Sequence, residues 1–414
     1  LLPVTADIRF PLLATESLDY VGQPLAIVLA TSHAIAAHAA GLVAFDIDEL
    51  APVQDFDSLQ PETRVQHKAG MAPAGAAHRV EANIDSARVT AMAMEPRGCL
   101  ASWDNVASSI TIWLGTQTPT RAQADFAIAL QLPLEKVRVI SPDVGGAFGF
   151  RASVYPEDLL TAMAARHIRG SVRWASSRSE DFVAGMHGRG SRMQGELALD
   201  DAGNFLALKA RLTFTHGAWL PYSGVVPLRN AARILPGPYR VCSLDIEGQA
   251  SRSHAAPVNI YRGAGRPEAA LLMETLVDKA ARACGMDPVE LRRRNLIAAA
   301  DMPYQTPTGE TLDSGDYALA LNRACERFGY DTERQRQQQR IANGKLVGIG
   351  VGLYIEPCGQ GWETARVTLE ADGKVTVASG APAQGQGHAT PFAQIAAREL
   401  GRDVADVTVI LGDT

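Results

Sequence analysis

Three glycine-rich segments constrain this chain more than any other feature of its sequence. They span residues 144–151 (VGGAFGFR), 261–268 (YRGAGRPE) and 384–390 (QGQGHAT), and each directly follows a strand-like or extended run. Glycine lets backbone N–H groups approach an anion or an oxo ligand closely. Taken singly, each segment is also explained as a tight turn. Three such segments in one chain favour loops that bind a ligand.

The spacing inside these segments argues against one class of enzyme. None of them ends in the Lys-Ser/Thr pair of a phosphate-binding loop, and none has the G-x-G-x-x-G spacing within a strand–helix–strand unit. A flavin or nicotinamide dehydrogenase, the alternative enzyme, requires such a loop. A dinucleotide-binding fold of the nicotinamide type is therefore a poor match.

The composition of the chain argues against a membrane segment and against nucleic acid as a partner. The chain has 414 residues, of which 46% are hydrophobic and 20% charged, as in an ordinary globular protein of two or three domains. No apolar run approaches the ~20 residues that span a bilayer, so no membrane segment is expected. The formal net charge is -6, and Lys and Arg are scattered, which argues against nucleic-acid binding.

The cysteines point to a reducing compartment, and we expect a cytoplasmic protein. They are odd in number, widely spaced and never arranged as C-x-x-C, which argues against a disulfide framework and against an iron–sulfur or zinc site within this chain. They are Cys99, Cys242, Cys284, Cys325 and Cys358.

Hydrophobic periodicity predicts an α+β (mixed α/β) fold. Residues 1–65 have a strand-like run at 25–29 and an Ala-rich helix at 33–40, and residues 66–80, rich in Pro, Gly and Ala, are expected to be a linker. Residues 81–330 form the main domain. Within it we predict strands at 110–114, 137–140 and 172–175, a hairpin that turns at 200–204, and helices at 157–167, at 268–283 and after Asp287.

The last part of the chain is predicted to begin a new domain. Residues 331–346 are charged and Gln-rich, which is typical of an exposed connector. Strands are expected at 347–355, 365–370 and 374–379, with a turn at 371–373 between the last two. The sequence stops directly after another strand-like stretch, so the domain at 347–414 is expected to be unfinished.

Six motifs in order carry a family resemblance. They are residues 94–97 (MEPR), 116–119 (TQTP), the loop around Phe148, residues 155–158 (YPED), residues 261–268 and residues 385–388. Their order resembles the large subunit of the xanthine dehydrogenase, aldehyde oxidase and carbon monoxide dehydrogenase family, over nearly the whole chain. The resemblance implies a partial hammerhead-like domain at 1–65 and two molybdenum-cofactor-binding domains at 81–330 and 347–414.

The resemblance also implies an activity, which is hydroxylation of an aldehyde or N-heteroaromatic carbon with oxygen from water. The expected cofactor is molybdenum with molybdopterin, in the cytosine dinucleotide form, with the metal held through the pterin dithiolene and not by side chains. In the family a molybdenum-bound hydroxide attacks the substrate carbon, hydride passes to a sulfido ligand, and a Glu acts as base. That Glu is expected beyond residue 414, so the chain alone is expected to be inactive.

Partners follow from the same resemblance. Electrons must pass from molybdenum to other chains, namely an iron–sulfur small subunit with [2Fe-2S] clusters and an FAD-binding medium subunit. The missing part is explained either by a second chain that completes the molybdenum subunit or by truncation. A cofactor-binding module or inactive fragment without turnover stays open as a non-catalytic alternative.

The resemblance assigns roles to individual residues. Gln117 would donate to an oxo or sulfido ligand of molybdenum, the amides of Phe148 and Gly149 would approach its apical ligand, and Arg262 would lie beside the metal. For Arg262 a salt bridge with Glu268 or Glu157 is an equal alternative, and Phe148 could be core. The expected cofactor contacts are Gly146, Ala147, Phe148, Gly149, Arg151, Gly263, Ala264, Gly265, Arg266, Gly385, Gln386, Gly387 and His388.

Departures from the family pattern narrow the substrate. Ala152 replaces the substrate-anchoring Glu of purine-hydroxylating relatives, which disfavours xanthine. Gly263 replaces the copper-binding Cys of the carbon monoxide dehydrogenases, and a glycine supplies no thiolate ligand. Ala147 and Arg151 stand where the family has Gly and Lys, which reshapes the loop without abolishing binding.

Overall fold

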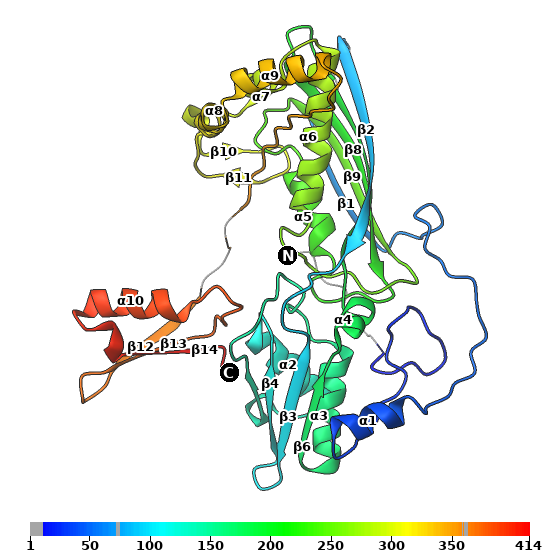
Figure 1. Ribbon diagram of the computed structural model, residues 1–414, viewed down its shortest axis with the longest axis vertical. Helices are drawn as coiled ribbons and strands as arrows, with labels where there is room; N and C mark the ends of the chain where they lie inside the picture. Colours follow the sequence, from blue (N-terminus) through cyan, green and yellow to red (C-terminus); the bar gives the residue numbers. More distant parts are fainter. Residues whose placement is uncertain (1–10, 72–74, 358, 360–362) are drawn as a thin grey trace.

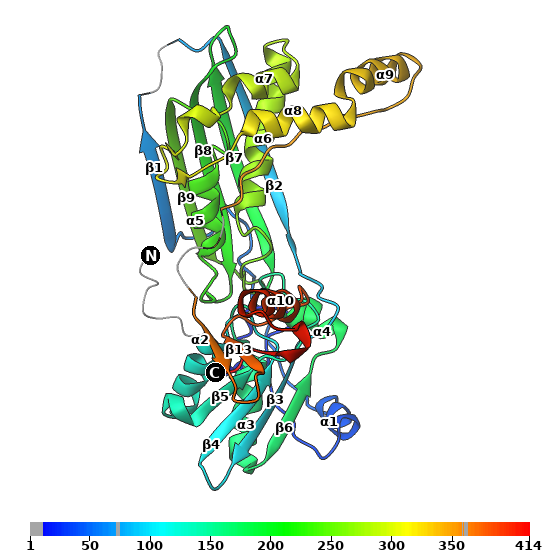
Figure 2. The ribbon, with the colours of Figure 1, turned by 90° about the vertical axis from the view of Figure 1, so that its left-hand side faces the viewer.

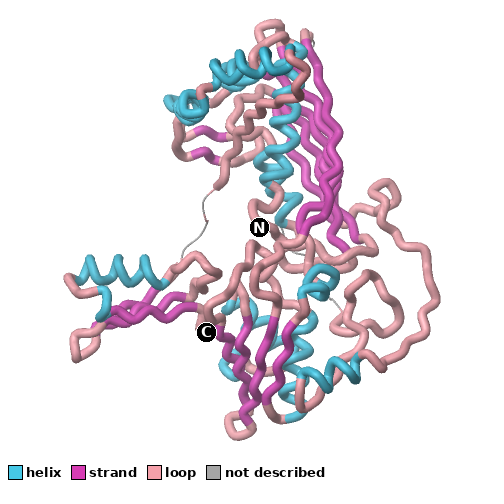
Figure 3. The backbone as a smooth tube through the Cα atoms, in the orientation of Figure 1, coloured by secondary structure: helices cyan, strands magenta, loops and turns pink. Residues whose placement is uncertain are grey.

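Four β-sheets organise the part of the chain that the computed structural model describes, residues 11–71, 75–357, 359 and 363–414. The two larger sheets lie one above the other, and a smaller sheet extends to one side (Figure 1). Loops occupy the region between the two larger sheets (Figure 3). The predicted mixed α/β fold class is confirmed.

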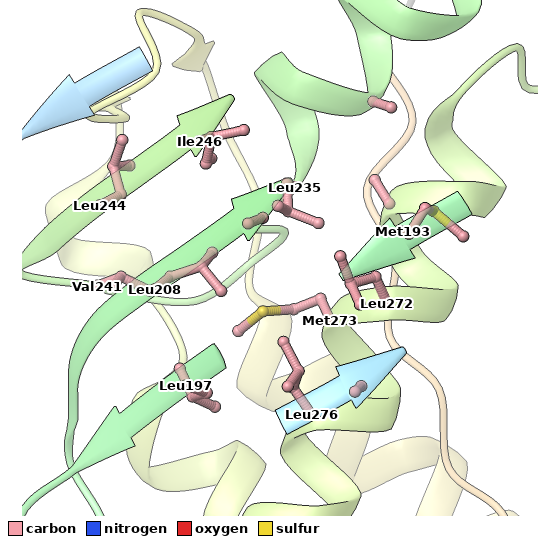
Figure 4. Packing of buried hydrophobic residues seen from close by; sticks show 14 of the residues in the cluster. Met193, Leu197, Leu208, Leu235, Val241, Leu244, Ile246, Leu272, Met273 and Leu276 are labelled. Carbon is pink, nitrogen blue, oxygen red and sulfur yellow. The ribbon is translucent and has the colours of Figure 1, made fainter. Parts of the chain in front are cut away.

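The upper sheet has five strands in the order β1-β9-β8-β7-β2. Helices α5 (Val226–Ile234) and α6 (Arg266–Ala283) cover one of its faces. The apolar residues of α6 recur at helical spacing and are buried against Met193, Leu197 and Leu208 of the sheet (Figure 4). The strands are β1 (Thr63–Ala69), β2 (His78–Val89), β7 (Gly188–Leu199), β8 (Phe205–Gly217) and β9 (Ser243–Arg252).

The lower sheet has four strands in the order β5-β4-β3-β6, packed against two helices. Ile110, Ile112 and Leu114 alternate along β4 and are all buried, as expected for a strand with one covered face. The elements are β3 (Gly98–Asp104), β4 (Ser109–Leu114), β5 (Val137–Ile140), β6 (Ser171–Ala175), α2 (Pro119–Leu130) and α3 (Pro156–Ile168), with a short 3₁₀ turn at Leu134–Lys136. Helix α4 (Arg178–Ala184) follows β6.

The C-terminal unit is a three-stranded sheet with one helix. Its elements are β12 (Ala365–Leu369), β13 (Val375–Ser379), β14 (Val407–Leu411) and α10 (Ala389–Leu400), with a 3₁₀ turn at Val404–Asp406. A bridge between Ile140 and Asp413 joins it to the lower sheet beside β5 (Figure 2). The side chain of Arg138 donates to Asp413 at 2.8 Å, which adds an ion pair to this contact.

A helical layer lies over α6. It contains α7 (Pro288–Asn295), α8 (Tyr317–Phe328) and α9 (Tyr330–Ala342), together with the strand pair β10 (Tyr304–Gln305) and β11 (Thr311–Leu312) and a 3₁₀ turn at Ala299–Asp301. Arg292 of α7 is fully buried, and its guanidinium contacts Glu274 at 2.8 Å and Asp278 at 2.9 Å. Its third contact is the carbonyl of Val351, at 2.7 Å.

Most predicted elements of the middle region are confirmed. The helix after Asp287 begins as expected, since the Asp287 carboxylate accepts from the N–H groups of Val289 and Glu290. The hairpin turn at 200–204 joins β7 to β8, and the turn at 371–373 joins β12 to β13. Helix α1 (His33–Ala40) has the predicted bounds.

Three local predictions are wrong, and the role of 331–346 as a connector stays a prediction. The runs at 25–29 and 347–355 form no strand, because no neighbouring strand pairs with them in the described residues; Leu353 instead donates to the carboxylate of Glu274 at 2.9 Å. The expected linker at 66–80 contains most of β1, which pairs with β9, and the start of β2. The connector at 331–346 is largely helix α9, although most of its residues are exposed as expected. The domain boundaries themselves stay predictions.

Each helix in the described ranges is too short or too polar to cross a bilayer.

Candidate functional site

A cleft of about 1020 Å³ brings the three glycine-rich segments together. Residues of all three segments line it, although more than a hundred positions of sequence separate each from the next. The predicted site residues in its lining are Gln117, Gly146, Ala147, Phe148, Gly149, Arg262, Gly263, Ala264, Arg266, Gly385 and Gln386. Those outside the lining are Arg151, Gly265, Gly387 and His388.

Gln117 is fixed in orientation by the Phe148 loop. The backbone N–H of Gly149 donates to Oε1 of Gln117 at 2.9 Å. Since the oxygen faces that donor, the Nε2 group of Gln117 remains available as a donor, with no acceptor among the described residues. The Gly149 amide, expected to approach an apical ligand, is therefore already engaged, whereas the N–H of Phe148 has no acceptor in the described part of the chain.

The Phe148 loop needs its unusual backbone. Phe148 has a φ of 55°, and its side chain is 43% exposed, so it is not simple core. Gly149 has a φ of 101°, and a Cβ added there would lie 2.7 Å from the carbonyl oxygen of Ile260. The carbonyl of Phe148 accepts from the N–H of Arg262 at 2.9 Å, which joins the first glycine-rich segment to the second.

Arg189 holds the second segment. Its guanidinium donates to the carbonyl oxygens of Tyr261 and Arg262 at 3.1 and 2.9 Å, and the buried carboxylate of Glu268 lies 3.8 Å from it. Burial raises the pKa of Glu268 and Arg189 opposes this rise. Glu157 pairs instead with Arg97, at 3.1 Å. The alternative salt bridges of Arg262 are therefore not formed, and its side chain has no partner in the described ranges.

Gly265 sets the close contact between this segment and α5. It precedes α6 with a φ of 88°, and a Cβ added there would lie 1.9 Å from the carbonyl oxygen of Pro227. Asn230 of α5 donates to the carbonyl of Ala264 at 3.0 Å. Any side chain at position 265 would push the segment away from α5.

Arg151 lies outside the cleft lining and binds Glu95. Its side chain is 6% exposed and donates to the carboxylate of Glu95 at 3.2 Å and to the carbonyl of Glu95 at 2.6 Å. Glu95 also accepts from the N–H of Gly145 at 2.7 Å. The motif at 94–97 therefore holds the first glycine-rich loop through Arg151, which was expected to contact a cofactor. The buried Ala152 likewise lies outside the cleft lining.

The third segment presents unpaired donors. Nε2 of Gln384 donates to the carbonyl of Thr116 at 2.9 Å, which places the segment beside the TQTP motif. The imidazole of His388 stacks on Phe392 at 5.4 Å, and its buried Nδ1 atom has no partner in the described part. No described residue accepts from the four backbone N–H groups at positions 385–388.

Sequence reasoning missed the wall formed by α5. Arg229, Asn230 and Arg233 of this helix line the cleft. The carboxylate of Glu310 pairs with Arg233, and that of Glu356 pairs with Arg266 at 2.7 Å. The only sequence signal was the helical spacing of polar residues between the buried Leu228, Ala231 and Ala232, which does not reveal that this face borders a cleft.

Comparison with known proteins decides the family. Residues 59–296 match a molybdopterin cofactor-binding domain, and residues 323–414 match a second domain family of the same description. The chain belongs to the molybdenum-cofactor-binding large subunits of the molybdenum hydroxylase family. The predicted resemblance is thereby confirmed.

Relatives of this molybdenum hydroxylase chain include two proteins of Paenarthrobacter nicotinovorans. The nicotine 6-hydroxylase large subunit is 29% identical, with 97% of this chain and 53% of the relative covered. The 6-hydroxypseudooxynicotine dehydrogenase complex subunit gamma is 31% identical, with 99% and 54% covered. The chain thus spans about half the length of these relatives.

Solved structures agree with this assignment. Quinoline 2-oxidoreductase from Pseudomonas putida 86 has a TM-score of 0.93 and 33% identity, covering 98% of this chain and 55% of that one. The Cu,Mo-CO dehydrogenase has a TM-score of 0.91 and 26% identity, covering 97% and 57%.

The lining of the cleft fits a molybdopterin. Phe148, Gly385, Gln386 and Gln117 line it with N–H donors that have no acceptor among the described residues, and a pterin with phosphate and oxo groups would supply oxygen or sulfur acceptors. In the described ranges no three His, Cys, Asp or Glu side chains gather as a metal site.

Proposed function

We propose that this chain supplies part of the molybdenum-cofactor and substrate site of an enzyme that hydroxylates an aldehyde or N-heteroaromatic carbon with oxygen from water. The observation that carries the proposal is the convergence of the three glycine-rich segments on one cleft in a chain of this family. The bound cofactor would supply the oxygen and accept two electrons. We infer its cytosine dinucleotide form from the family resemblance.

The chain's own residues would hold and orient this group. Gln117 would donate through Nε2, because its oxygen is held by Gly149. The N–H of Phe148 would donate beside it, and Arg262, which has no ion-pair partner in the described residues, would stabilise negative charge at the reacting centre. The donors at 385–388 would hold the pterin and its phosphates.

The remaining parts of the enzyme are proposed from the family. An iron–sulfur small subunit and an FAD-binding medium subunit would take the electrons, and a segment or second chain would add the catalytic Glu. Within the described residues Cys99, Cys242, Cys284 and Cys325 are free thiols, which supports the proposed cytoplasmic location.

The test is purification of the complex from its native host. We expect molybdenum, a pterin, cytidine nucleotide, iron and flavin, together with turnover of an aldehyde or N-heteroaromatic. Gln117→Ala should lower turnover at least about tenfold while molybdenum content is retained, because one donor of the site is lost. The matched control is Gln338→Ala on the exposed part of α9, which should change neither.

The non-catalytic alternative predicts a different result. A purified complex with molybdenum and pterin but no turnover of any aldehyde or N-heteroaromatic would favour a cofactor-binding module. A complex with neither metal nor pterin would contradict both the enzyme and the binding module.

A further inference from the structure

Helix α5 gives the cleft a positively charged wall. Arg229 and Arg233 are four residues apart, so they lie on the same face of the helix, and both line the cleft. Arg262 and Arg266 line it from the second glycine-rich segment. Four arginines therefore line one cleft.

Among the described residues, carboxylates neutralise two of these four arginines. Glu310 pairs with Arg233, and Glu356 pairs with Arg266 at 2.7 Å. Arg229 has no hydrogen-bond or ion-pair partner among the described residues, and its Nε atom is buried. Burial and then the neighbouring charges of Arg233 and Arg266 lower the pKa of Arg229, as expected for a cation that lacks its anion.

A half-buried guanidinium whose Nε atom is buried without a partner is unfavourable, since desolvation removes hydration there and no described residue replaces it. The planar fork of an arginine matches a carboxylate with two parallel hydrogen bonds. The phosphates of a molybdopterin have a separate set of unpaired donors at residues 385–388, on the C-terminal unit. Arg229 instead lies on the helix that holds the Ala264 carbonyl through Asn230, and its charged neighbours include Arg233 and Arg266.

We propose that Arg229 binds a carboxylate group of the substrate, so that the enzyme prefers aromatic substrates carrying an acid group over their neutral amides. This inference rests on the proposed function and names the substrate class of the same cleft. Arg229 acts as a specificity-determining residue, whereas the charge of the neighbouring Arg233 is balanced by Glu310.

The experiment compares acid and amide ligands on the purified complex. The probes are nicotinate with nicotinamide, and 4-carboxybenzaldehyde with 4-carbamoylbenzaldehyde, with dissociation constants from calorimetry and KM where turnover is measured. We expect the acid of at least one pair to bind the wild-type complex tenfold or more tightly than its amide. Arg229→Gln should abolish this preference, with a much larger loss of affinity for the acid than for the amide, while Arg229→Lys should restore part of it.

Arg211→Gln is the matched control, because it removes one positive charge from an exposed side chain of β8 outside the cleft. It should keep the full preference for the acid. A wild-type complex without the preference, or an Arg229→Gln complex that retains it, would overturn the proposal.

The cofactor content of the variant shows whether Arg229 binds a carboxylate of the substrate or a phosphate of the cofactor. Molybdenum, pterin and released cytidine nucleotide should be equal in wild type and Arg229→Gln. A lower pterin content in the variant would assign Arg229 to a cofactor phosphate and overturn the proposal. A wild-type complex without molybdenum would contradict the proposed function instead, and the calorimetric comparison of acid with amide would still decide the role of Arg229.

Discussion

At the scale of single residues, several positions in the site are restricted by backbone geometry as much as by chemistry. Gly149 and Gly265 both have positive φ values and both face a carbonyl oxygen of another segment, of Ile260 and Pro227 respectively. These contacts hold the first and second glycine-rich segments and helix α5 in fixed relation before any ligand binds. Preorganisation of this kind lowers the cost of binding a rigid group.

Gly265→Ala should therefore destabilise the protein strongly. Its Cβ would lie 1.9 Å from the Pro227 oxygen at a φ of 88°, and we expect the free energy of unfolding to fall by at least about 2 kcal/mol. Gly401→Ala is the control, since Gly401 has a φ of 63° but no atom within 4 Å of an added Cβ. It should cost about 1 kcal/mol. Urea unfolding measures both, and equal losses would contradict the argument.

The raised pKa of Asp158 should make the stability of the protein depend on pH. Burial raises its pKa from an ordinary value of 3.8 to about 7, although the Tyr155 N–H and Arg97 oppose the rise. Because the unfolded chain loses this proton first, stability should fall as the pH rises from 4 to 7, by at most about 1.4 kcal/mol per pH unit.

Asp158→Asn keeps an acceptor for the Tyr155 N–H but removes the titration, so unfolding midpoints measured from pH 5 to pH 8 should vary less than in wild type. The control is Asp104→Asn. Asp104 is exposed, and backbone hydrogen bonds lower its pKa, so its contribution is constant over this range. An unchanged pH profile in Asp158→Asn would refute the assignment.

Motifs predicted which loops meet in the cleft, but not the direction of every side chain. Arg151 lies in a glycine-rich loop and was expected to face a cofactor, whereas its guanidinium turns back to Glu95. Arg229 lies in no motif and was missed, because its importance depends on which helix face borders the cleft. Such directions depend on tertiary packing, which local sequence does not encode.

At the scale of elements, the helices and paired strands of the middle region were predictable because local signals and packing agree there. Helix α7 has an Asp N-cap and Pro at its first turn, and α6 has an apolar face that packs on the sheet. The run at 347–355 has alternating apolar residues but no strand beside it among the described residues. A strand requires a neighbouring strand to pair with, and the sequence alone does not reveal whether residues 347–355 have one.

Arg292 joins three elements, and its loss should be costly. It connects α7 to Glu274 and Asp278 of α6 and to the carbonyl of Val351, with no exposed side-chain surface. Arg292→Met removes the cation from the largely buried Glu274 and the partly exposed Asp278, so the free energy of unfolding should fall by about 3 kcal/mol. The neighbouring Arg293→Met removes a 40% exposed arginine and should cost less than about 1 kcal/mol. Comparable losses in urea unfolding would show that the buried network is unimportant.

At the scale of the whole molecule, the cleft receives its third glycine-rich segment from the C-terminal unit, which lies against the lower sheet. Two kinds of contact hold it there. The Gln384 side chain donates to the Thr116 carbonyl, and the last residues of the chain follow β5, where Ser141 donates to the carbonyl of Gly412 at 2.8 Å. Gly385 and Gln386 border the cleft through this docking, so cofactor binding and docking should be linked thermodynamically.

Reversing one charge at this junction should test that linkage. Arg138 and Asp413 form an ion pair with 56% and 27% of their side chains exposed, worth up to about 1 kcal/mol. Arg138→Asp replaces attraction with repulsion, so the pterin content of the purified complex should fall and protease cleavage within residues 343–364 should become several-fold faster. The double variant Arg138→Asp with Asp413→Arg should restore both, because the pair is re-formed in reverse. If pterin content fell equally in the single and double variants, the loss would come from the substitution at β5 itself and docking would not control the site.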